Sequence, residues 1–133
     1  MRKINKIIVH CSATKEGRDF DVEDVRNWHV KGNKWKDVGY HYVIKLDGTI
    51  QKGRDVSVIG SHAYGYNKDS IGVCYIGGLD SEGNAKDTRT KQQKDALRAL
   101  YLELFNLYQC EIIGHNEVSK TKSCPCFNVQ TEL

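Results

Sequence analysis

The sequence predicts an α/β fold, in which residues 1–133 form a single domain with a central mixed β-sheet and helices packed on its faces. Strand-like and helix-like segments alternate along the chain, which is typical of this class. A turn signal at residues 47–48, between two alternating segments, adds an antiparallel hairpin to the sheet. A chain of 133 residues fits one compact domain, and 39% hydrophobic with 28% charged residues can bury a core and stay globular.

The first quarter of the chain predicts one strand and one helix. Residues 6–9 are rich in β-branched side chains and are closed by a polar run, so they indicate a short buried strand with His10 at its C-terminal end. A helix is expected from Asp21 to about Lys31, because apolar residues recur there at helical spacing and Gly32 is placed to end it.

The hairpin is predicted from residues 40–45 and 49–51, which flank Asp47-Gly48. Successive side chains of a strand point to opposite faces. We therefore expect Tyr40, Tyr42 and Ile44 on one face and His41 with Val43 on the other.

The second half of the chain predicts a central strand, a long helix and a last strand. Residues 71–76 are almost continuously apolar, as in a strand covered on both faces, and residues 79–89 indicate a surface loop. Thr90 with Gln93 forms a capping-box pair, and an apolar stripe follows it, made of Leu97, Leu100, Tyr101, Leu104 and Phe105. Residues 111–113 then indicate a short strand that leads into Gly114-His115.

Composition excludes several classes of protein. The excess of 20 Lys and Arg over 17 Asp and Glu is small and scattered, so a nucleic-acid partner is not expected. The apolar run at residues 7–9 is far too short for a signal peptide or a membrane span, so we expect no membrane insertion and a cytoplasmic protein when synthesised. Five cysteines without regular spacing argue against a disulfide framework.

Two histidines share one context. His10 and His115 each follow a short apolar strand, which is where α/β folds place functional groups. If the two strands are neighbours, both imidazoles meet, and Cys124 is placed to return to them. Two His and one Cys suit zinc and leave its fourth position open. The alternatives are a hydrogen-bonded structural histidine at each strand end and a buried turn at Cys-Pro-Cys.

Five segments resemble a known family. They are IIVHCSAT (7–14), DVGYHYVIKLDGTIQKGRD (37–55), GSHAYGYNKDSIGVCYIGG (60–78), GHNEV (114–118) and KSCPCF (122–127). In order and spacing they resemble type 2 N-acetylmuramoyl-L-alanine amidases, especially small bacteriophage amidase-type lysozymes. The resemblance implies a zinc enzyme that hydrolyses the amide between the lactyl group of N-acetylmuramic acid and L-alanine in peptidoglycan, acting as a phage or prophage endolysin on the cell wall.

The resemblance also implies roles for individual residues. The family's zinc ligands fall on His10, His115 and Cys124, its catalytic tyrosine falls on Tyr40, and its catalytic lysine falls on Lys122. Zinc lowers the pKa of a water molecule and polarises a carbonyl, Lys122 would stabilise the oxyanion, and Tyr40 would donate or relay a proton. Without the resemblance, Tyr40 would be an ordinary strand aromatic and Lys122 a solvated charge.

The remaining candidates are secondary. His62, Asn67 and Ser70 are expected near the substrate cleft from the same resemblance, while His29 and His41 are expected to be packed or capping residues. Two cysteines are assigned no chemistry: Cys11 points away from His10 across the strand, and Cys74 is expected in the core. For Cys126, which stands where the family more often has a small polar residue, oxidation and exchange with Cys124 are both left open.

Three other functions compete with the amidase. A non-catalytic peptidoglycan-binding module on the same fold would lack the cysteine ligand, whereas Cys124 is present. Inhibition of phage RNA polymerase, known for some phage relatives, uses a segment before the first strand, and only residues 1–5 precede it here. A cysteine hydrolase would respond to alkylation and not to chelators. A monomer is the default expectation.

Overall fold

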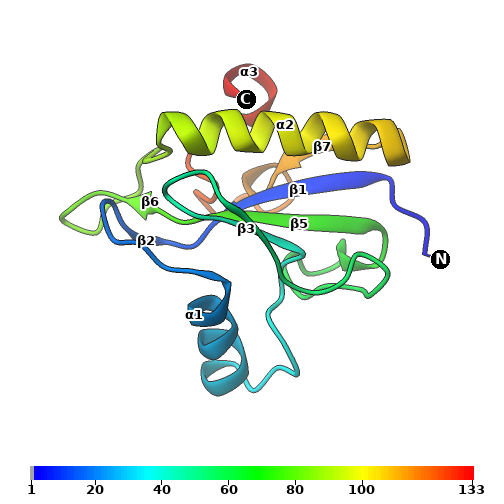
Figure 1. The fold of residues 1–133 in the computed structure, drawn as a ribbon, viewed down its shortest axis with the longest axis horizontal. Coiled ribbons are helices and arrows are strands. Elements are labelled where there is room, and N and C mark those ends of the chain that lie inside the picture. Colours follow the sequence, from blue (N-terminus) through cyan, green and yellow to red (C-terminus); the bar gives the residue numbers. More distant parts are fainter. Residues whose placement is uncertain (1) are drawn as a thin grey trace.

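A five-stranded sheet forms the centre of the computed structural model, which describes residues 2–133 (Figure 1). Met1, the first residue of the short segment ahead of the first strand, lies outside the described residues. The strand order is β4-β3-β5-β1-β7. The strands are β1 (Lys6–Cys11), β3 (Tyr42–Ile44), β4 (Ile50–Lys52), β5 (Ser70–Tyr75) and β7 (Glu111–Gly114).

The sheet is mixed, as the sequence predicts. β5 occupies the centre and is parallel to both β1 and β3, and β1 is also parallel to β7. Only the β3–β4 hairpin pairs antiparallel in this sheet. Every residue of β5 is buried, which explains why its sequence is almost continuously apolar and does not alternate.

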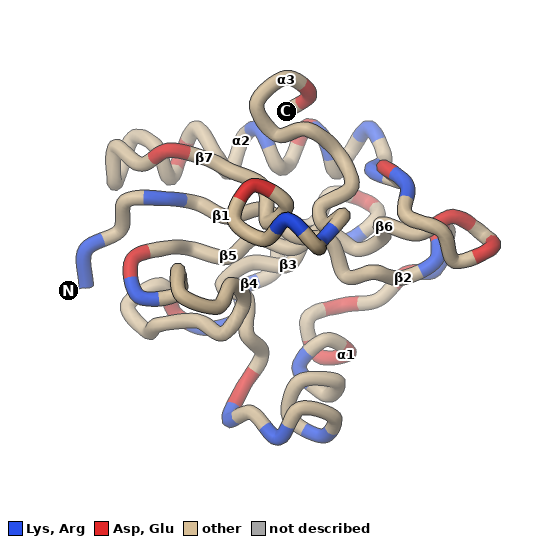
Figure 2. The backbone as a smooth tube through the Cα atoms, turned by 180° about the vertical axis from the view of Figure 1, so that it is seen from behind, with Lys and Arg blue, Asp and Glu red and all other residues tan. Residues whose placement is uncertain are grey.

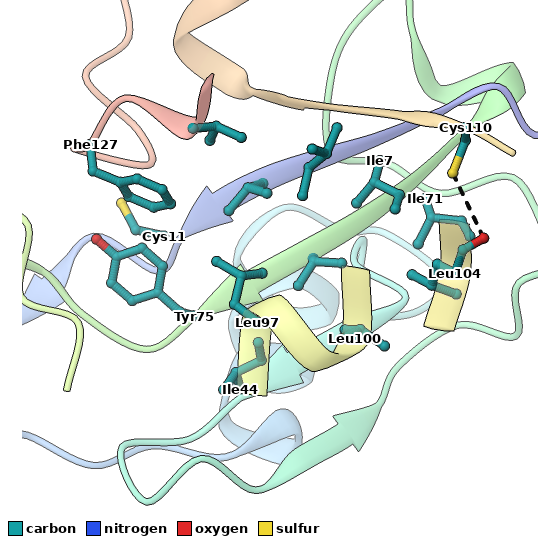
Figure 3. Packing of buried hydrophobic residues seen from close by; sticks show 14 of the residues in the cluster. Ile7, Cys11, Ile44, Ile71, Tyr75, Leu97, Leu100, Leu104, Cys110 and Phe127 are labelled. Carbon is teal, nitrogen blue, oxygen red and sulfur yellow. Dashed lines mark hydrogen bonds between the residues drawn. The ribbon is translucent and has the colours of Figure 1, made fainter. Parts of the chain in front are cut away.

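Helix α2 (Lys91–Tyr108) packs on one face of the sheet. Thr90 caps it as predicted: its side chain accepts a hydrogen bond from Gln93 N, and the Gln93 side chain accepts one from Thr90 N. Its buried leucines meet side chains of β1, β3 and β5 in the main core (Figure 3), and those leucines are Leu97, Leu100 and Leu104. Phe105 belongs to the predicted stripe but is 39% exposed and is not part of this core.

Helix α1 (Val22–Asn27) covers the opposite face, where Val22 and Val25 pack with Val43 in a second, smaller core (Figure 1). Asp21 is the N-cap of this helix, which therefore begins at the expected place, but regular α-helix ends earlier than predicted. The chain continues as the π-helix η1 (Trp28–Gly32), which has wider turns than an α-helix. The helical segment therefore still ends at Gly32, as expected.

The hairpin forms where expected, but Tyr40 does not belong to its strand. Because β3 begins only at Tyr42, strand alternation does not extend back to residue 40. Tyr42 and Ile44 face the main core, whereas Tyr40 packs with Val43 against the smaller core. The expectation that Tyr40 shares a face with Tyr42 and Ile44 is therefore wrong.

A second sheet joins two short segments that the sequence did not single out. Strand β2 (Thr14–Lys15) pairs in parallel with β6 (Gly78–Leu79), and Leu79 is the first residue of the expected surface loop. The remaining elements are short helices: η2 (Asn67–Asp69), η3 (His115–Glu117) and α3 (Val129–Glu132).

Charged residues of both signs are interspersed along the chain (Figure 2). Within residues 2–133, every helix is too short or too polar to cross a bilayer. The expectation of no nucleic-acid partner stays a prediction.

Candidate metal centre and active site

Neighbouring strands bring His10 and His115 together. β1 and β7 pair in parallel with Val9 opposite Gly114, so the residues that follow these two positions leave the sheet side by side. The ring centroids of His10 and His115 are 4.6 Å apart. The sequence predicted that the two histidines would meet if their strands were neighbours, and β1 and β7 are neighbours.

Two hydrogen bonds hold the segment that carries Cys124 against the central sheet. The Cys124 Sγ accepts a hydrogen bond from Cys11 N at 3.1 Å, and the Tyr75 hydroxyl donates to Pro125 O at 2.7 Å. Gly114 has no side chain to keep this segment away, since a Cβ there would lie 3.0 Å from Pro125 Cδ. The glycine before His115 therefore permits the return of Cys124 to the end of β7.

The three side chains are close enough together to share one metal ion. One ligand atom from each of His10, His115 and Cys124 lies within 4.8 Å of the other two. Zinc–nitrogen and zinc–sulfur bonds are about 2.0–2.3 Å long, so atoms bound to one zinc ion are separated by less than 4.8 Å. Two nitrogens with one sulfur also match zinc's preference for ligands.

Both histidines of this group have lowered pKa values. Burial, and then the neighbouring histidines, hold the pKa of His10 well below its usual range. Burial and the nearby Lys122 lower the pKa of His115. Both imidazoles are therefore neutral near pH 7, as metal ligation requires.

The three residues border an open cleft. Two adjoining cavities of about 580 Å³ and 510 Å³ share Tyr40, His62, His115 and Lys122 in their walls. The Tyr40 ring lies 5.1 Å from the His10 ring, centroid to centroid. Burial, with the thiols of Cys74, Cys124 and Cys11, raises the pKa of the Tyr40 hydroxyl well above its usual value, so it keeps its proton at neutral pH.

His62 contacts one of the three possible metal ligands, His10. Its Nδ1 is 2.9 Å from His10 Nε2, and its ring reaches the cleft. Asn67 also lines the larger cavity, where its Oδ1 accepts hydrogen bonds from His62 N and Ala63 N, both at 2.9 Å. Ser70, which we expected in the cleft wall, is instead fully buried, with its hydroxyl 3.3 Å from His62 Nε2. Its position at the start of the fully buried β5 keeps it beneath His62 and away from the cleft surface.

The cleft residues that sequence reasoning missed include His29 and Trp35. His29 Nδ1 accepts a hydrogen bond from Gly39 N at 2.8 Å, and its ring packs on Tyr40, so it is a packed residue and not a helix cap, but the ring also lines the larger cavity. Trp35 packs against it with ring centroids 4.7 Å apart. The signal that could have found them is their proximity in sequence to Tyr40, because η1 and the segment after it lead directly into that residue.

The other cysteines lie outside the ligand group. Cys74 is buried in β5, as expected, and burial raises its pKa well above the usual value. Cys11 and Cys126 have their sulfur atoms 3.9 Å apart, and the Cys126 thiol donates to Gly78 O at 3.3 Å. Burial, followed by Cys11, raises the pKa of Cys126 to about 12, so this residue is a protonated thiol at neutral pH.

Comparison with known proteins gives one consistent family. Residues 1–127 match the family model described as N-acetylmuramoyl-L-alanine amidase. The chain is 46% identical over 125 residues to the endolysin of Escherichia phage T7, a match that covers 93% of this chain and 82% of the endolysin.

Solved structures agree with this match. The N-acetylmuramoyl-L-alanine amidase LysC from Clostridium intestinale superimposes with a TM-score of 0.80 and 29% identity, covering 96% of this chain and 79% of LysC. Drosophila PGRP-LB, a peptidoglycan recognition protein, superimposes with a TM-score of 0.78 and 28% identity, covering 94% of this chain and 76% of that protein.

Proposed function

This chain belongs to the N-acetylmuramoyl-L-alanine amidase family and is an amidase of that type, and we propose that it is a zinc-dependent endolysin that hydrolyses the amide between the lactyl group of N-acetylmuramic acid and L-alanine. The observation that carries the zinc proposal is the convergence of His10, His115 and Cys124, whose ligand atoms lie within 4.8 Å of one another beside an open cleft. Peptidoglycan of the cell wall is the proposed substrate.

The residues around the proposed ion divide the work of amide hydrolysis. His10, His115 and Cys124 would hold zinc, and three protein ligands would leave its fourth coordination position open. When bound, zinc supplies Lewis-acid chemistry, which lowers the pKa of a water molecule and polarises a carbonyl. Lys122 lines both cavities and is close enough to His115 to lower that histidine's pKa, so its ammonium is placed to stabilise the oxyanion that develops on the carbonyl oxygen.

Tyr40 is the proposed proton donor or relay. Its hydroxyl keeps its proton at neutral pH, and its side chain lines the cleft with its ring next to His10. Amide cleavage requires a proton on the leaving nitrogen, and a positioned hydroxyl group can deliver it. Lys122 thus stabilises the developing charge and Tyr40 transfers the proton, while His10, His115 and Cys124 bind the metal.

Binding of peptidoglycan without cleavage is the alternative, because recognition proteins share this fold. Recognition alone needs no complete metal-binding set. The presence of His10, His115 and Cys124 together with Tyr40 and Lys122 favours hydrolysis. Binding to phage RNA polymerase stays a separate prediction that a pull-down with the polymerase would check.

The test combines metal analysis with product analysis. Purified protein should contain about one zinc per chain, and mass spectrometry of digested cell wall should show stem peptides that begin with a free L-alanine amine. Removal of the metal with a chelator should abolish digestion, and added zinc should restore it. Alkylation of Cys126, the half-buried thiol outside the proposed ligand set, should have little effect while the metal is retained, in contrast to a cysteine hydrolase.

The variant Cys124→Ala distinguishes loss of the metal from loss of the fold. It should lose zinc and lytic activity while its circular dichroism spectrum stays native. Full lysis by this variant in a zinc-free state would overturn the proposed mechanism. Intact wall binding without any product from the zinc-loaded wild type would instead support the recognition alternative.

A further inference from the structure

A chain of hydrogen bonds runs from the backbone to the metal centre through His62. The Ser70 hydroxyl donates to Tyr66 O at 2.7 Å and lies 3.3 Å from His62 Nε2. On the other side of the same ring, His62 Nδ1 lies 2.9 Å from His10 Nε2. A buried serine is thereby connected to a candidate zinc ligand by one intervening imidazole.

The direction of each hydrogen bond follows from the first one. A hydroxyl has a single proton, and that of Ser70 is used on the carbonyl oxygen of Tyr66, so the serine oxygen accepts from His62 Nε2–H. A neutral imidazole carries one N–H and one lone pair, so His62 Nδ1 is then an acceptor. His10 must donate to it from Nε2–H. The one ring nitrogen of His10 that keeps a free lone pair is Nδ1.

We propose that Ser70 and His62 are positioning residues, which together hold His10 in the Nε2–H tautomer and so leave its Nδ1 unprotonated for the metal. Outer hydrogen-bond partners of metal-binding histidines fix the tautomer and the ring orientation in this way. The assignment of Nδ1 to a metal rests on the proposed zinc function. The tautomer assignment does not, because it follows from hydrogen bonds within the chain.

Two features hold the His62 ring in place: hydrogen bonds to its loop and packing of the ring on β5. Asn67 Oδ1 accepts the backbone N–H groups of His62 and Ala63, which fixes the loop that carries the ring. The ring itself lies against the backbone of β5 at Gly72, where a Cβ would come within 2.5 Å of His62 Cγ. A glycine in the middle of the central strand, which otherwise weakens a strand, therefore makes room for His62.

The first test is the tautomer in metal-free protein. Nitrogen-15 NMR of the imidazole rings distinguishes protonated from unprotonated nitrogens, and we expect His62 and His10 both to be protonated at Nε2 and unprotonated at Nδ1. A proton on Nδ1 of His10 in the wild type would overturn the proposal. This measurement involves neither zinc nor activity.

The second test compares variants at His62 by zinc affinity, measured in competition with a chromogenic chelator. His62→Phe keeps a ring but removes the acceptor for His10, and we expect it to bind zinc about 10- to 100-fold more weakly, the usual effect of losing an outer partner. His62→Gln has a carbonyl oxygen for His10 and an amide for Ser70, so it should recover most of the affinity. Ser70→Ala should show a smaller loss and a mixed tautomer at His62.

These outcomes separate the relay from the proposed function. Wild-type affinity in His62→Phe, or equal losses in His62→Phe and His62→Gln, would overturn the positioning role. If the wild type shows the expected tautomers but binds no zinc, the zinc proposal fails and the hydrogen-bond relay is supported. If the wild type binds zinc and digests cell wall with the opposite tautomer at His10, the relay alone fails.

Discussion

The two cysteines on either side of Pro125 differ in what their sulfur atoms contact. Cys124 belongs to the group of possible metal ligands, whereas Cys126 Sγ lies near Cys11 Sγ and Gly78 O. Cys126→Ser should therefore keep about one zinc per chain and full lytic activity, while the identical change at Cys124 should abolish both. Zinc-to-protein ratios of the two variants check this. Loss of zinc in Cys126→Ser would show that the two thiols exchange as ligands.

Lys122 is the residue whose loss should affect catalysis without affecting the metal. Removing one group that stabilises an oxyanion typically lowers kcat by about 10²- to 10³-fold. We expect Lys122→Ala to show a loss of that order with an unchanged zinc content. Lys120→Ala is the matched control, because that lysine is exposed in the same segment and does not line the cleft. Equal activity of the two variants would remove Lys122 from the mechanism.

At the scale of elements, one buried glutamine connects α2 to the sheet. Gln93 Nε2 donates to Ile44 O at 3.2 Å and Ile76 O at 3.0 Å, and its Oε1 accepts from Thr90 N at 3.0 Å. Gln93→Leu leaves these three groups without that partner, and we expect the free energy of unfolding to fall by about 3 kcal/mol or more. Urea unfolding measures this loss.

The neighbouring residue gives a control with the same chemical change. Gln92 is exposed on the same turn, so Gln92→Leu should alter the free energy of unfolding by less than about 0.5 kcal/mol. Similar losses in both variants would mean that helix propensity or solubility, and not the buried hydrogen bonds, sets the effect.

Elements with local signals were predictable from the sequence. The capping box of Thr90 and Gln93 and the leucine stripe of α2 are both contained in one segment, and both were confirmed. β2 and β6 were missed because a pairing of two residues has no periodicity to detect. The face of Tyr40 was predicted wrongly because the start of β3 depends on contacts of residues 39–41 with distant backbone, such as His41 N with Gly72 O.

At the scale of the whole molecule, the candidate site joins segments that are far apart in the chain. Strand ends predicted that His10 and His115 would meet, since parallel neighbours end at one edge. The residues alone left the return of Cys124 and the roles of Tyr40 and Lys122 open, and the resemblance to a family supplied them. The burial of Ser70 behind His62 depends on tertiary packing against Gly72, which leaves no pattern in the sequence.

The stability of the whole molecule should depend on pH through His41. This ring is 1% exposed, its Nδ1 accepts from Gly72 N at 3.0 Å, and its Nε2 lies 2.8 Å from Val58 O. Burial, reinforced by Arg2 and Arg54 and opposed by Val58 O and Asp55, lowers its pKa from 6.5 to about 4. Protonation is therefore less favourable in the folded chain than in the unfolded one.

The sign of the effect follows from this difference. Between pH 6.5 and about 4 the unfolded chain binds more protons at this site, so the free energy of unfolding falls as the pH falls. The contribution of His41 is complete above about pH 6.5 and is lost as the pH falls to about 4, a total on the order of 3 kcal/mol. Urea unfolding at pH 7 and pH 4.5 should show most of this loss.

His41→Gln isolates the contribution from those of the other histidines. The variant should be less stable than the wild type at pH 7, but its free energy of unfolding should decline less between pH 7 and pH 4.5, because glutamine does not titrate. Both proteins are compared with zinc chelated, so that competition between protons and metal at His10 and His115 does not enter. Equal declines in the free energy of unfolding of the two proteins would exclude His41 as a source of acid sensitivity. An NMR titration that gives His41 a pKa near 6.5 would exclude it independently. A group with the same pKa in the folded and unfolded chains contributes no pH dependence to stability.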